Sequence, residues 1–471
     1  MRNSHLTIIS GPSTCQVTGN FRAPTAWPSV HPPGSGLNLG GVTGPDDAQL
    51  HSLPTAQGLS SLFDDQGLAD LSNAQWLTRM LGVGIEGLEP NDVERPWVWV
   101  APGDGGQAMV GWGEQQRFTA TGPEPMTHAW YDYAEWSRAH GSVMPAFGSF
   151  PFDRDSQGFL VAPKALIMRP HPGAATSAYQ ASGITFTRSR TAHAPHPDDQ
   201  LPELSLEFVV DDSAPAHWAQ IVDATKAALT DPARAMDKVV LARSVHAAAD
   251  RPMSQSRVLQ ALATRFEDCW IYAADGLVGA TPELLAEASE GIFHCRILAG
   301  TRKPQWDAEL MTDPKERREH ELSVTSVTEH LAGAGLTQAE ITGPFLLQLP
   351  NVTHLATDIR ARIAPGHGSA DIADLLYPTA AICGVPRELA FEQIRRIEDL
   401  DRGRFSGPVG WITADGSGQW GLALRCAQFT PGSQQAELFA GAGILPDSQA
   451  EREWLETDAK MEPMRRALLA G

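Results

Sequence analysis

The chain has no apolar run long enough to span a bilayer, which takes about 20 residues. Its N-terminus also lacks the charged start, the apolar centre and the small-residue cleavage site of a secretory signal. With 471 residues, of which 42% are hydrophobic, the sequence is long enough to bury a large core. We therefore expect a globular protein located in the cytoplasm.

Cysteine is scarce, and no two cysteines form a CxxC pair. Such wide spacing supports neither a disulfide framework nor a thiolate zinc site. We expect reduced and mostly buried thiols at Cys15, Cys269, Cys295, Cys383 and Cys426.

Basic residues are outnumbered, because 36 Lys and Arg face 56 Asp and Glu, for a formal net charge of -20. This charge argues against a nucleic-acid or anionic-membrane partner, since such partners are bound through basic patches. A small anionic substrate stays compatible with the sequence if a few Lys or Arg side chains, or a bound cation, reverse the potential locally.

Residues 1–56 are rich in Pro, Gly, Ser and Thr and have no sustained apolar periodicity, which predicts a poorly ordered N-terminal extension. The rest, residues 57–471, alternates strand-like runs such as WVWVA and MVGWG with turns and helical segments. A loop or linker at 191–203 separates an N-terminal part, 57–205, from a motif-bearing part, 206–471. Hairpins with helices set aside predict one α+β domain of antiparallel sheets.

The segment DPKERREHELS begins a predicted helix. Asp313 can cap it, Pro314 suits its first position, and Glu316 is placed as a capping-box partner. At helical spacing, one face carries Glu316, Glu319, His320 and Ser323.

The segment EREWLETDAK near the C-terminus carries a second polar stripe, formed by Glu453, Glu456, Thr457 and Lys460. An exposed Glu456–Lys460 ion pair is the simplest explanation of this spacing. If the stripe instead faced Glu316 and Glu319, the four carboxylates would require a cation. Oxygen ligands with room for water would favour Mg²⁺ over zinc.

Lys238 begins the strand-like run KVVLARSV and shares its face with small side chains. A lysine desolvated in such a pocket can act as a base, although a lysine snorkelling at a strand end is the simpler explanation of the pattern. Arg425 in RCAQF lies on the side of small residues, where it can meet a ligand carboxylate or form a buried ion pair.

Three further positions have both a structural and a functional interpretation. Gly441 and Gly443 in LFAGAGILP indicate either a bend or a close backbone approach beside the N-terminus of the last helix. Glu283 follows Pro282 in a turn, as a solvated glutamate or as a desolvated proton donor. His354 in NVTHLATDI is either a structural histidine or a substrate contact.

The ordered motifs KVVLARSV, GATPELL, LAGTRKP, KERREHELSV, NVTHLATDI, YPTAAICGVPRELA, GPVGW, LALRCA and LFAGAGILPDSQAEREWLETDAK resemble those of chorismate-utilising enzymes, most closely the isochorismate synthases. The resemblance covers roughly residues 57–471. It implies antiparallel sheets around a deep cleft, with helices outside, and Mg²⁺-dependent conversion of chorismate to isochorismate.

Carried over motif by motif, the resemblance implies a role for each site residue. Lys238 would be the base that activates water for attack at ring carbon 2, and Glu283 the acid that protonates the hydroxyl departing from carbon 4. The metal would be held directly by Glu319 and Glu456, and through water by Glu316 and Glu453. The substrate carboxylates would be bound by the metal, Lys460, Arg425 and the backbone around Thr301 and Gly441, with His354 lining the site.

Two related activities are alternatives. Aminating relatives use ammonia from a glutaminase partner and usually carry Gln where this chain has Lys238, so we expect no such partner. Salicylate synthases keep the lysine and further eliminate pyruvate. A third alternative is a non-catalytic metabolite-binding protein, which would have lost one of the residues that carry out the reaction. The resemblance also implies a monomer.

Overall fold

The computed structural model describes residues 51–52, 68–103, 106–142, 144–171, 176–181, 183–187, 204–303, 307–334, 336–429 and 432–470. The predicted extension, residues 1–56, lies outside these ranges except for His51 and Ser52, which form strand β1. The predicted linker at 191–203 also lies outside them.

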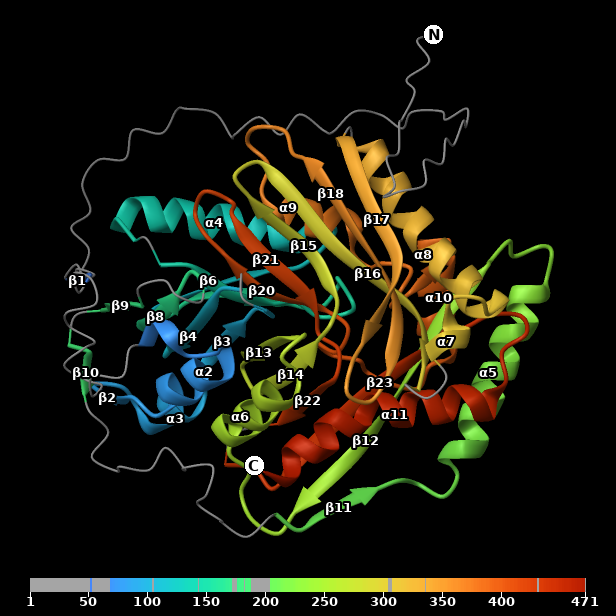
Figure 1. Cartoon of the computed structure of the whole chain (residues 1–471), viewed down its shortest axis with the longest axis horizontal. Helices are drawn as coiled ribbons and strands as arrows, with labels where there is room; N and C mark the ends of the chain where they lie inside the picture. The colour runs from blue at the N-terminus through green and yellow to red at the C-terminus, as the bar shows by residue number, and fades with distance from the viewer. Residues whose placement is uncertain are drawn as a thin grey trace.

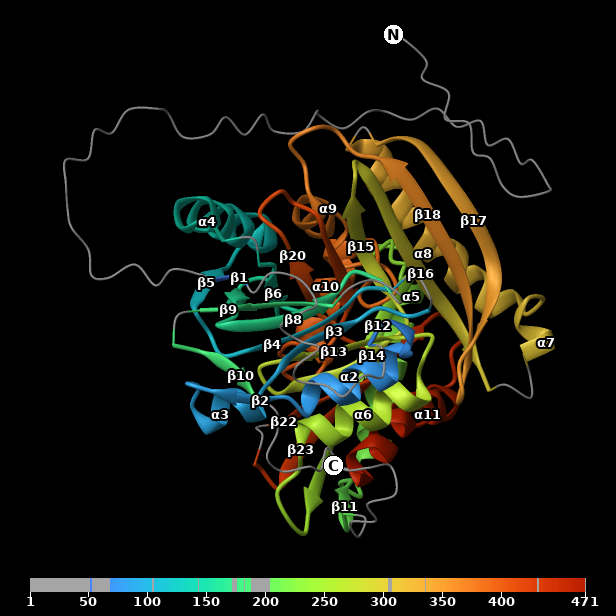
Figure 2. The ribbon, with the colours of Figure 1, turned by 60° about the vertical axis from the view of Figure 1, so that its left-hand side comes forward.

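Two large sheets form the body of the described chain (Figures 1 and 2). The first sheet has the order β1-β9-β8-β4-β3-β13-β14-β22-β23-β12-β11, with β19 pairing with β12. Its strands are β1 (His51–Ser52), β3 (Trp97–Val100), β4 (Ala108–Trp112), β8 (Ala165–Arg169), β9 (Ser177–Gln180), β11 (Leu206–Val209), β12 (Lys238–Ala249), β13 (Trp270–Ala274), β14 (Leu277–Thr281), β19 (Gly384–Val385), β22 (Cys426–Phe429) and β23 (Gln435–Ile444).

The second sheet has the order β17-β18-β16-β15-β21-β20-β6-β7-β5. Its strands are β5 (Gln116–Ala120), β6 (Ala146–Ser149), β7 (Gly158–Ala162), β15 (Leu284–Ser289), β16 (Ile292–Arg302), β17 (Thr337–Gln348), β18 (Thr353–Arg362), β20 (Pro408–Ile412) and β21 (Gly418–Leu422). A small sheet pairs β2 (Gly84–Glu86) with β10 (Thr185–Thr187). The pairings in both large sheets are antiparallel, so the predicted α+β class is confirmed.

The helices lie on the outside of the two sheets (Figure 1). Those of the described chain are α2 (Asn73–Leu81), α3 (Pro90–Glu94), α4 (Pro125–His140), α5 (Ala214–Thr230), α6 (Gln255–Arg265), α7 (Asp307–Leu310), α8 (Pro314–Gly333), α9 (Ser369–Leu376), α10 (Arg387–Ile397) and α11 (Ala450–Leu469), with a 3-10 turn at Leu68–Asp70. Helices α2, α6 and α11 pack on the first sheet, and α4, α8 and α9 on the second.

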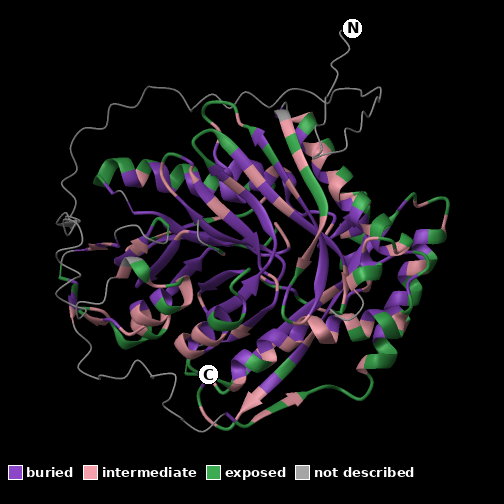
Figure 3. Cartoon of the chain, viewed as in Figure 1, coloured by how far each residue is buried: buried purple, intermediate pink, exposed green. Residues whose placement is uncertain are grey.

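The facing sides of the two sheets bury large side chains against each other. Members of this cluster come from both sheets, with Trp99 and Leu166 on the first and Phe147 and Trp411 on the second. Trp99 Nε1 donates a hydrogen bond across the interface to Gln419 Oε1, at 2.8 Å. Figure 3 shows buried residues (purple) concentrated in the central strands and exposed residues (green) on the outer helices. The site described below therefore rests on a packed interior.

Two of the places where the chain passes from one sheet to the other are neighbouring corners. One corner lies between β14 and β15, and the other between β21 and β22. Leu422 N donates to Glu283 O at 3.2 Å, and Ala280 N donates to Arg425 O at 3.3 Å. The two corners are thus bonded to each other, and they bring Glu283 and Arg425 to the same place.

Helix α8 begins where the sequence predicts. The Asp313 carboxylate accepts the N–H groups of Lys315 and Glu316, and Pro314 is the first helical residue. The predicted capping box is wrong, because the Glu316 carboxylate accepts the N–H of Thr301 instead, at 2.9 Å. Since α8 packs on β16, this side chain turns inward rather than back to its own first turn.

Two predictions from composition can be compared with the described residues. The cysteines Cys269, Cys295, Cys383 and Cys426 are free and buried, as expected, while Cys15 lies outside the described ranges. Among the helices in these ranges, none combines the length and the apolar character that crossing a membrane demands.

A buried carboxylate joins α9 to the start of α4 and gives a first testable prediction. Asp374 accepts the N–H groups of Thr127 at 2.8 Å and Met126 at 3.4 Å. Asp374→Ala leaves these buried donors unpaired, and we expect it to lower the free energy of unfolding by about 2 kcal/mol. Urea denaturation compares this variant with Asp132→Ala, at an exposed position of α4. Equal midpoints for the two variants would contradict the bridging role.

Candidate active site

A cavity opens beside the two corners, with about 680 Å³ of empty space when its opening to solvent is included. Most of the site residues predicted from the sequence line it: Glu283, Thr301, Glu319, His354, Arg425, Gly441 and Lys460. Three other predicted residues contact this lining through ion pairs or a hydrogen bond: Lys238, Glu316 and Glu456. Glu453 pairs instead with Lys315, which is not a lining residue of this cavity. The sequence stripes on α8 and α11 therefore do converge on one region.

Glu283 is a buried carboxyl at the first corner. Burial raises its pKa to about 8, against the opposing effects of Lys238, a backbone hydrogen bond from Leu298, Lys460 and Arg425. Its own N–H donates to Thr281 Oγ1 at 3.3 Å. At neutral pH this carboxyl is mostly protonated, so it is able to donate a proton into the cavity.

Lys238, the first residue of β12, is fully buried. Its Nζ lies 3.1 Å from Glu319 Oε1 and donates to Ser323 Oγ at 3.2 Å. The room for this ion pair comes from Gly443, where a Cβ atom would stand 2.3 Å from Glu319 Oε1. The small neighbours expected from the sequence are present. The amine of Lys238, however, forms an ion pair with the carboxylate of Glu319 and does not face open space.

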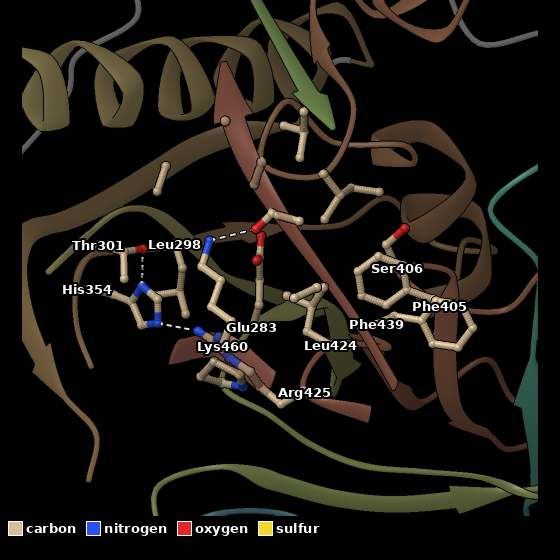
Figure 4. Close-up of a pocket in the computed structure, with 18 of the residues that line it drawn as sticks. Glu283, Leu298, Thr301, His354, Phe405, Ser406, Leu424, Arg425, Phe439 and Lys460 are labelled. Atoms are coloured by element: carbon tan, nitrogen blue, oxygen red, sulfur yellow. Dashed lines mark hydrogen bonds between the residues drawn. The ribbon is translucent and has the colours of Figure 1, made fainter. Parts of the chain in front are cut away.

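Arg425, His354 and Thr301 form a chain of hydrogen bonds along one wall (Figure 4). Arg425 Nη2 donates to His354 Nε2 at 2.7 Å, and His354 Nδ1 lies 3.0 Å from Thr301 Oγ1. Burial and then the neighbouring Arg425 hold the pKa of His354 well below its usual value, so the ring is neutral. Arg425 Nη1 is buried without a partner, which leaves a charged donor available to an anion.

The four carboxylates predicted to lie together are each held by a basic side chain. Lys315 Nζ lies 2.7 Å from Glu453 Oε1, and Arg452 Nη2 lies 2.6 Å from Glu316 Oε1. Glu319 pairs with Lys238, and Glu456 with Lys460 at 2.6 Å. Lys460 also donates to Gly441 O at 2.9 Å. The α11 stripe thus contains the expected Glu456–Lys460 pair, placed at the edge of the cavity.

The electrostatics show that these carboxylates influence one another. Burial, and then Glu319 and Glu456, raise the pKa of Glu316 to about 7. Burial and then Glu456 raise the pKa of Glu453 as well. Burial alone would also raise the pKa of Glu319, but the charges of Lys238, Lys315 and Lys460 outweigh it and lower that pKa. Among the described residues, no three His, Cys, Asp or Glu side chains gather closely enough to hold a metal ion as they lie.

Two local predictions are wrong. Arg425 is not part of a regular strand, because it precedes β22 and has a left-handed φ of 50°. Alternation with its neighbours therefore does not determine its direction. Gly441 and Gly443 lie within β23, opposite Ala242 and Val240, and do not adjoin the N-terminus of α11. The second glycine allows the close approach of Glu319, but the pair forms no anion site with that helix.

Several residues at the site were not singled out from the sequence. Lys315 and Arg452 lie beside the predicted stripes rather than on them, so helical spacing gave no signal for them. Phe405 and Phe439 stack with ring centroids 5.3 Å apart and form an apolar wall on the side away from His354 (Figure 4). A pocket with cationic groups inside an acidic chain, one polar wall and one aromatic wall suits a small, partly apolar anion.

Comparison with known proteins identifies the family to which this chain belongs. The sequence profile of the family described as chorismate binding enzymes matches residues 166–469, which is more than half of the chain. This chain belongs to the chorismate-binding enzymes, and the resemblance noted from its motifs is confirmed.

Individual relatives agree with this assignment. The vibriobactin-specific isochorismate synthase of Vibrio cholerae is 34% identical over 241 residues, 48% of this chain and 60% of that protein. The isochorismate synthase EntC of Escherichia coli is 31% identical over 342 residues, 70% of this chain and 82% of that protein. The solved structure of the putative isochorismate synthase DhbC from Bacillus anthracis has a TM-score of 0.67 at 24% identity, covering 84% of this chain and 100% of that one. The structural likeness supports the shared fold.

Proposed function

We propose that this chain converts chorismate to isochorismate, by adding water at ring carbon 2 while the hydroxyl at carbon 4 departs. The observation that carries the proposal is a buried glutamic acid of raised pKa that lines the cavity, together with a buried lysine that pairs with another lining residue, Glu319. The relatives described above are isochorismate synthases, and the family match includes both residues. A dianionic substrate also suits the cationic groups of this acidic chain.

Two side chains would handle the protons of this reaction. Lys238 would take a proton from the attacking water, and Glu283 would give one to the departing hydroxyl. The raised pKa of about 8 supports the second role, because Glu283 then carries its proton at neutral pH. Simultaneous acid and base catalysis needs both groups at the ring at once, in opposite protonation states.

Three groups would bind the carboxylates of the substrate. Arg425 would bind the enolpyruvyl carboxylate through its unpartnered Nη1, with His354 holding the other side of the guanidinium. Lys460 would bind the ring carboxylate from its place beside Gly441 O. The N–H of Thr301 is already donated to Glu316, so Thr301 would act through its hydroxyl or after that bond opens.

The carboxylate cluster fits a hard divalent cation in its chemistry. Every donor is a carboxylate oxygen, the pKa of Glu316 reports repulsion from Glu319 and Glu456, and Glu453 Oε2 is buried without a partner. Mg²⁺ would supply the positive charge that binds the ring carboxylate. Glu319 and Glu456 would hold it directly, and Glu316 and Glu453 through water, once their present ion pairs are exchanged.

Glu319 would couple the cation to the base. Its Oε1 is the atom that now pairs with Lys238 Nζ, at 3.1 Å. An amine that removes a proton from water must first be released from such a pair. With Glu319 committed to a cation, Lys238 would be free to contact the attacking water.

We expect metal binding to be measurable without turnover. Mg²⁺ at about a hundredfold excess over its Kd should stabilise the native protein by about 2.7 kcal/mol. Glu319→Gln should remove this stabilisation, whereas Glu321→Gln, at an exposed position of the same helix, should retain it. Thermal unfolding with Mg²⁺ or EDTA makes the comparison. Equal stabilisation of both variants would contradict the assignment of Glu319 as a ligand.

Product analysis tests the activity itself. Purified protein is incubated with chorismate, Mg²⁺ and ammonium, with an EDTA control, and the products are separated and identified by mass. Isochorismate without pyruvate, lost with EDTA, is the expected result. Salicylate with pyruvate would assign the chain to the sister activity, and an aminated product would overturn the argument from Lys238 and our expectation that no glutaminase partner is needed. Size-exclusion chromatography tests the proposed monomer.

A further inference from the structure

Helix α11 contains a proline in its interior, at Pro463. Proline has no N–H group, so the carbonyl four residues earlier, Ala459 O, has no donor within the helix. A side chain from a distant segment supplies that donor: Asn351 Nδ2 donates a hydrogen bond to Ala459 O at 2.8 Å. The missing helical bond is thus replaced by a bond to another part of the fold.

Asn351 lies in the turn that joins β17 to β18, and His354 is the second residue of β18. On either side of Asn351, Leu349 and Val352 belong to the same cluster of buried apolar side chains as Met464 of α11. The turn and the helix therefore share a core. The hydrogen bond from Asn351 adds a directional contact to it.

The two ends of this hydrogen bond adjoin the groups that would bind the carboxylates of the substrate. Ala459 directly precedes Lys460 in α11. Asn351 precedes His354 by three residues, and His354 Nε2 accepts a hydrogen bond from Arg425 Nη2 at 2.7 Å. Lys460 and His354 both line the cavity (Figure 4). The bond therefore connects the segments that carry two walls of the site.

Helix α11 is also fixed to the first sheet, through Arg243 of β12. Arg243 donates from Nε to Thr457 Oγ1 at 2.7 Å and from Nη2 to Asp458 Oδ1 at 3.0 Å. Its guanidinium lies 3.7 Å from the ring centroid of Trp454. Because these contacts hold the helix without Asn351, loss of the Asn351 bond should displace the hairpin turn rather than α11.

We propose that Asn351 is a positioning residue that fixes the distance between Lys460 and the hydrogen-bonded pair of His354 and Arg425, with Pro463 keeping the carbonyl of Ala459 free for it. The inference rests on the binding roles proposed above for Lys460 and Arg425. The two carboxylates of chorismate are joined by a short covalent frame. Both are bound well only where the protein holds their partners at a matching distance, before the substrate arrives.

The test compares Asn351→Ala in two backgrounds. In the wild-type chain, KM for chorismate should rise about five- to tenfold and the melting temperature should fall by roughly 1–2 °C, for the loss of one hydrogen bond. The value of kcat should stay within about twofold, because Lys238 and Glu283 lie on other segments. Pro463→Ala supplies the missing N–H to Ala459 O and alone should leave KM unchanged. In that background, Asn351→Ala should cost little melting temperature but raise KM by the same factor.

The matched control is Gln348→Ala, in the same hairpin. Gln348 Nε2 donates to Asp307 Oδ2 at 2.6 Å and so joins the hairpin to α7 instead of α11. Its loss should leave KM unchanged. The proposal is overturned by an unchanged KM in Asn351→Ala, by an equal rise in Gln348→Ala, or by a rise that disappears together with the loss of melting temperature in the Pro463→Ala background. Failure of the proposed function is seen separately, as absence of isochorismate with the wild-type protein.

Discussion

Lys238→Gln is expected to reduce the rate of isochorismate formation by a factor of roughly a thousand, because glutamine cannot take a proton from water. The amine it replaces is fully buried between Glu319 Oε1 at 3.1 Å and Ser323 Oγ at 3.2 Å. A glutamine amide has two N–H donors and can satisfy the same two oxygens. The fold should therefore survive, and the loss should appear in kcat.

The matched control is Lys226→Gln, which removes a lysine of α5 that is only loosely paired with Asp223 at 4.0 Å. Steady-state kinetics with chorismate, and thermal unfolding of both variants, make the comparison. Near wild-type turnover in Lys238→Gln would remove Lys238 from the chemistry. Unfolding of the variant at assay temperature would leave stability, rather than proton transfer, as the explanation of any loss. Ammonium in the assay adds one readout, because an aminated product from the variant would mean that Lys238 selects water.

Glu283→Gln is expected to lower kcat by a factor of roughly a hundred to ten thousand, since the amide has no acidic proton to give to the departing hydroxyl. Glutamine fills the same buried space and accepts the same backbone hydrogen bond from Leu298. Its control is Glu267→Gln, at an exposed position before β13. Equal kinetics in Glu283→Gln and the control would contradict the assignment.

The pH dependence supplies a second signature of Glu283. A proton donor must be protonated to act, and burial raises its pKa to about 8. The limb set by Glu283 should therefore appear as a fall in activity as pH rises through about 8. When kcat/KM is plotted against pH, this limb reports the pKa of the proton donor in the free enzyme. The limb should be absent from whatever residual activity Glu283→Gln retains, and its persistence would assign it to another group.

Sequence reasoning predicted the parts of the site that depend on local periodicity. The α+β class, the start of α8 at Pro314 and the common face of Glu316, His320 and Ser323 on that helix were predicted and are confirmed, and the structure adds that this face is buried. The resemblance to chorismate-utilising enzymes was likewise confirmed by the family match. These features follow from short-range patterns, in which spacing alone decides which side chains share a face.

What could not be predicted depends on contacts between distant segments. Lys315 and Arg452 complete the carboxylate cluster from positions that helical spacing assigns to neighbouring faces. Arg425 itself adopts a left-handed backbone conformation at a corner, which strand alternation does not describe. A second, small cavity beside the unpartnered Thr379 hydroxyl forms where α8, α9, β15, β16 and the segment after α9 meet.

The hydrogen-bonded corners between the sheets form one unit of the site, and the start of β12 forms another. Glu283 and Arg425, the proposed acid and the proposed anion-binding residue, are carried by segments that hydrogen-bond each other. Lys238 stands apart, at the end of a different strand, β12. If Lys238 selects the nucleophile as proposed, this selection can be altered by redesigning the end of β12 without changing the two corners. The two units can therefore be changed independently in protein engineering.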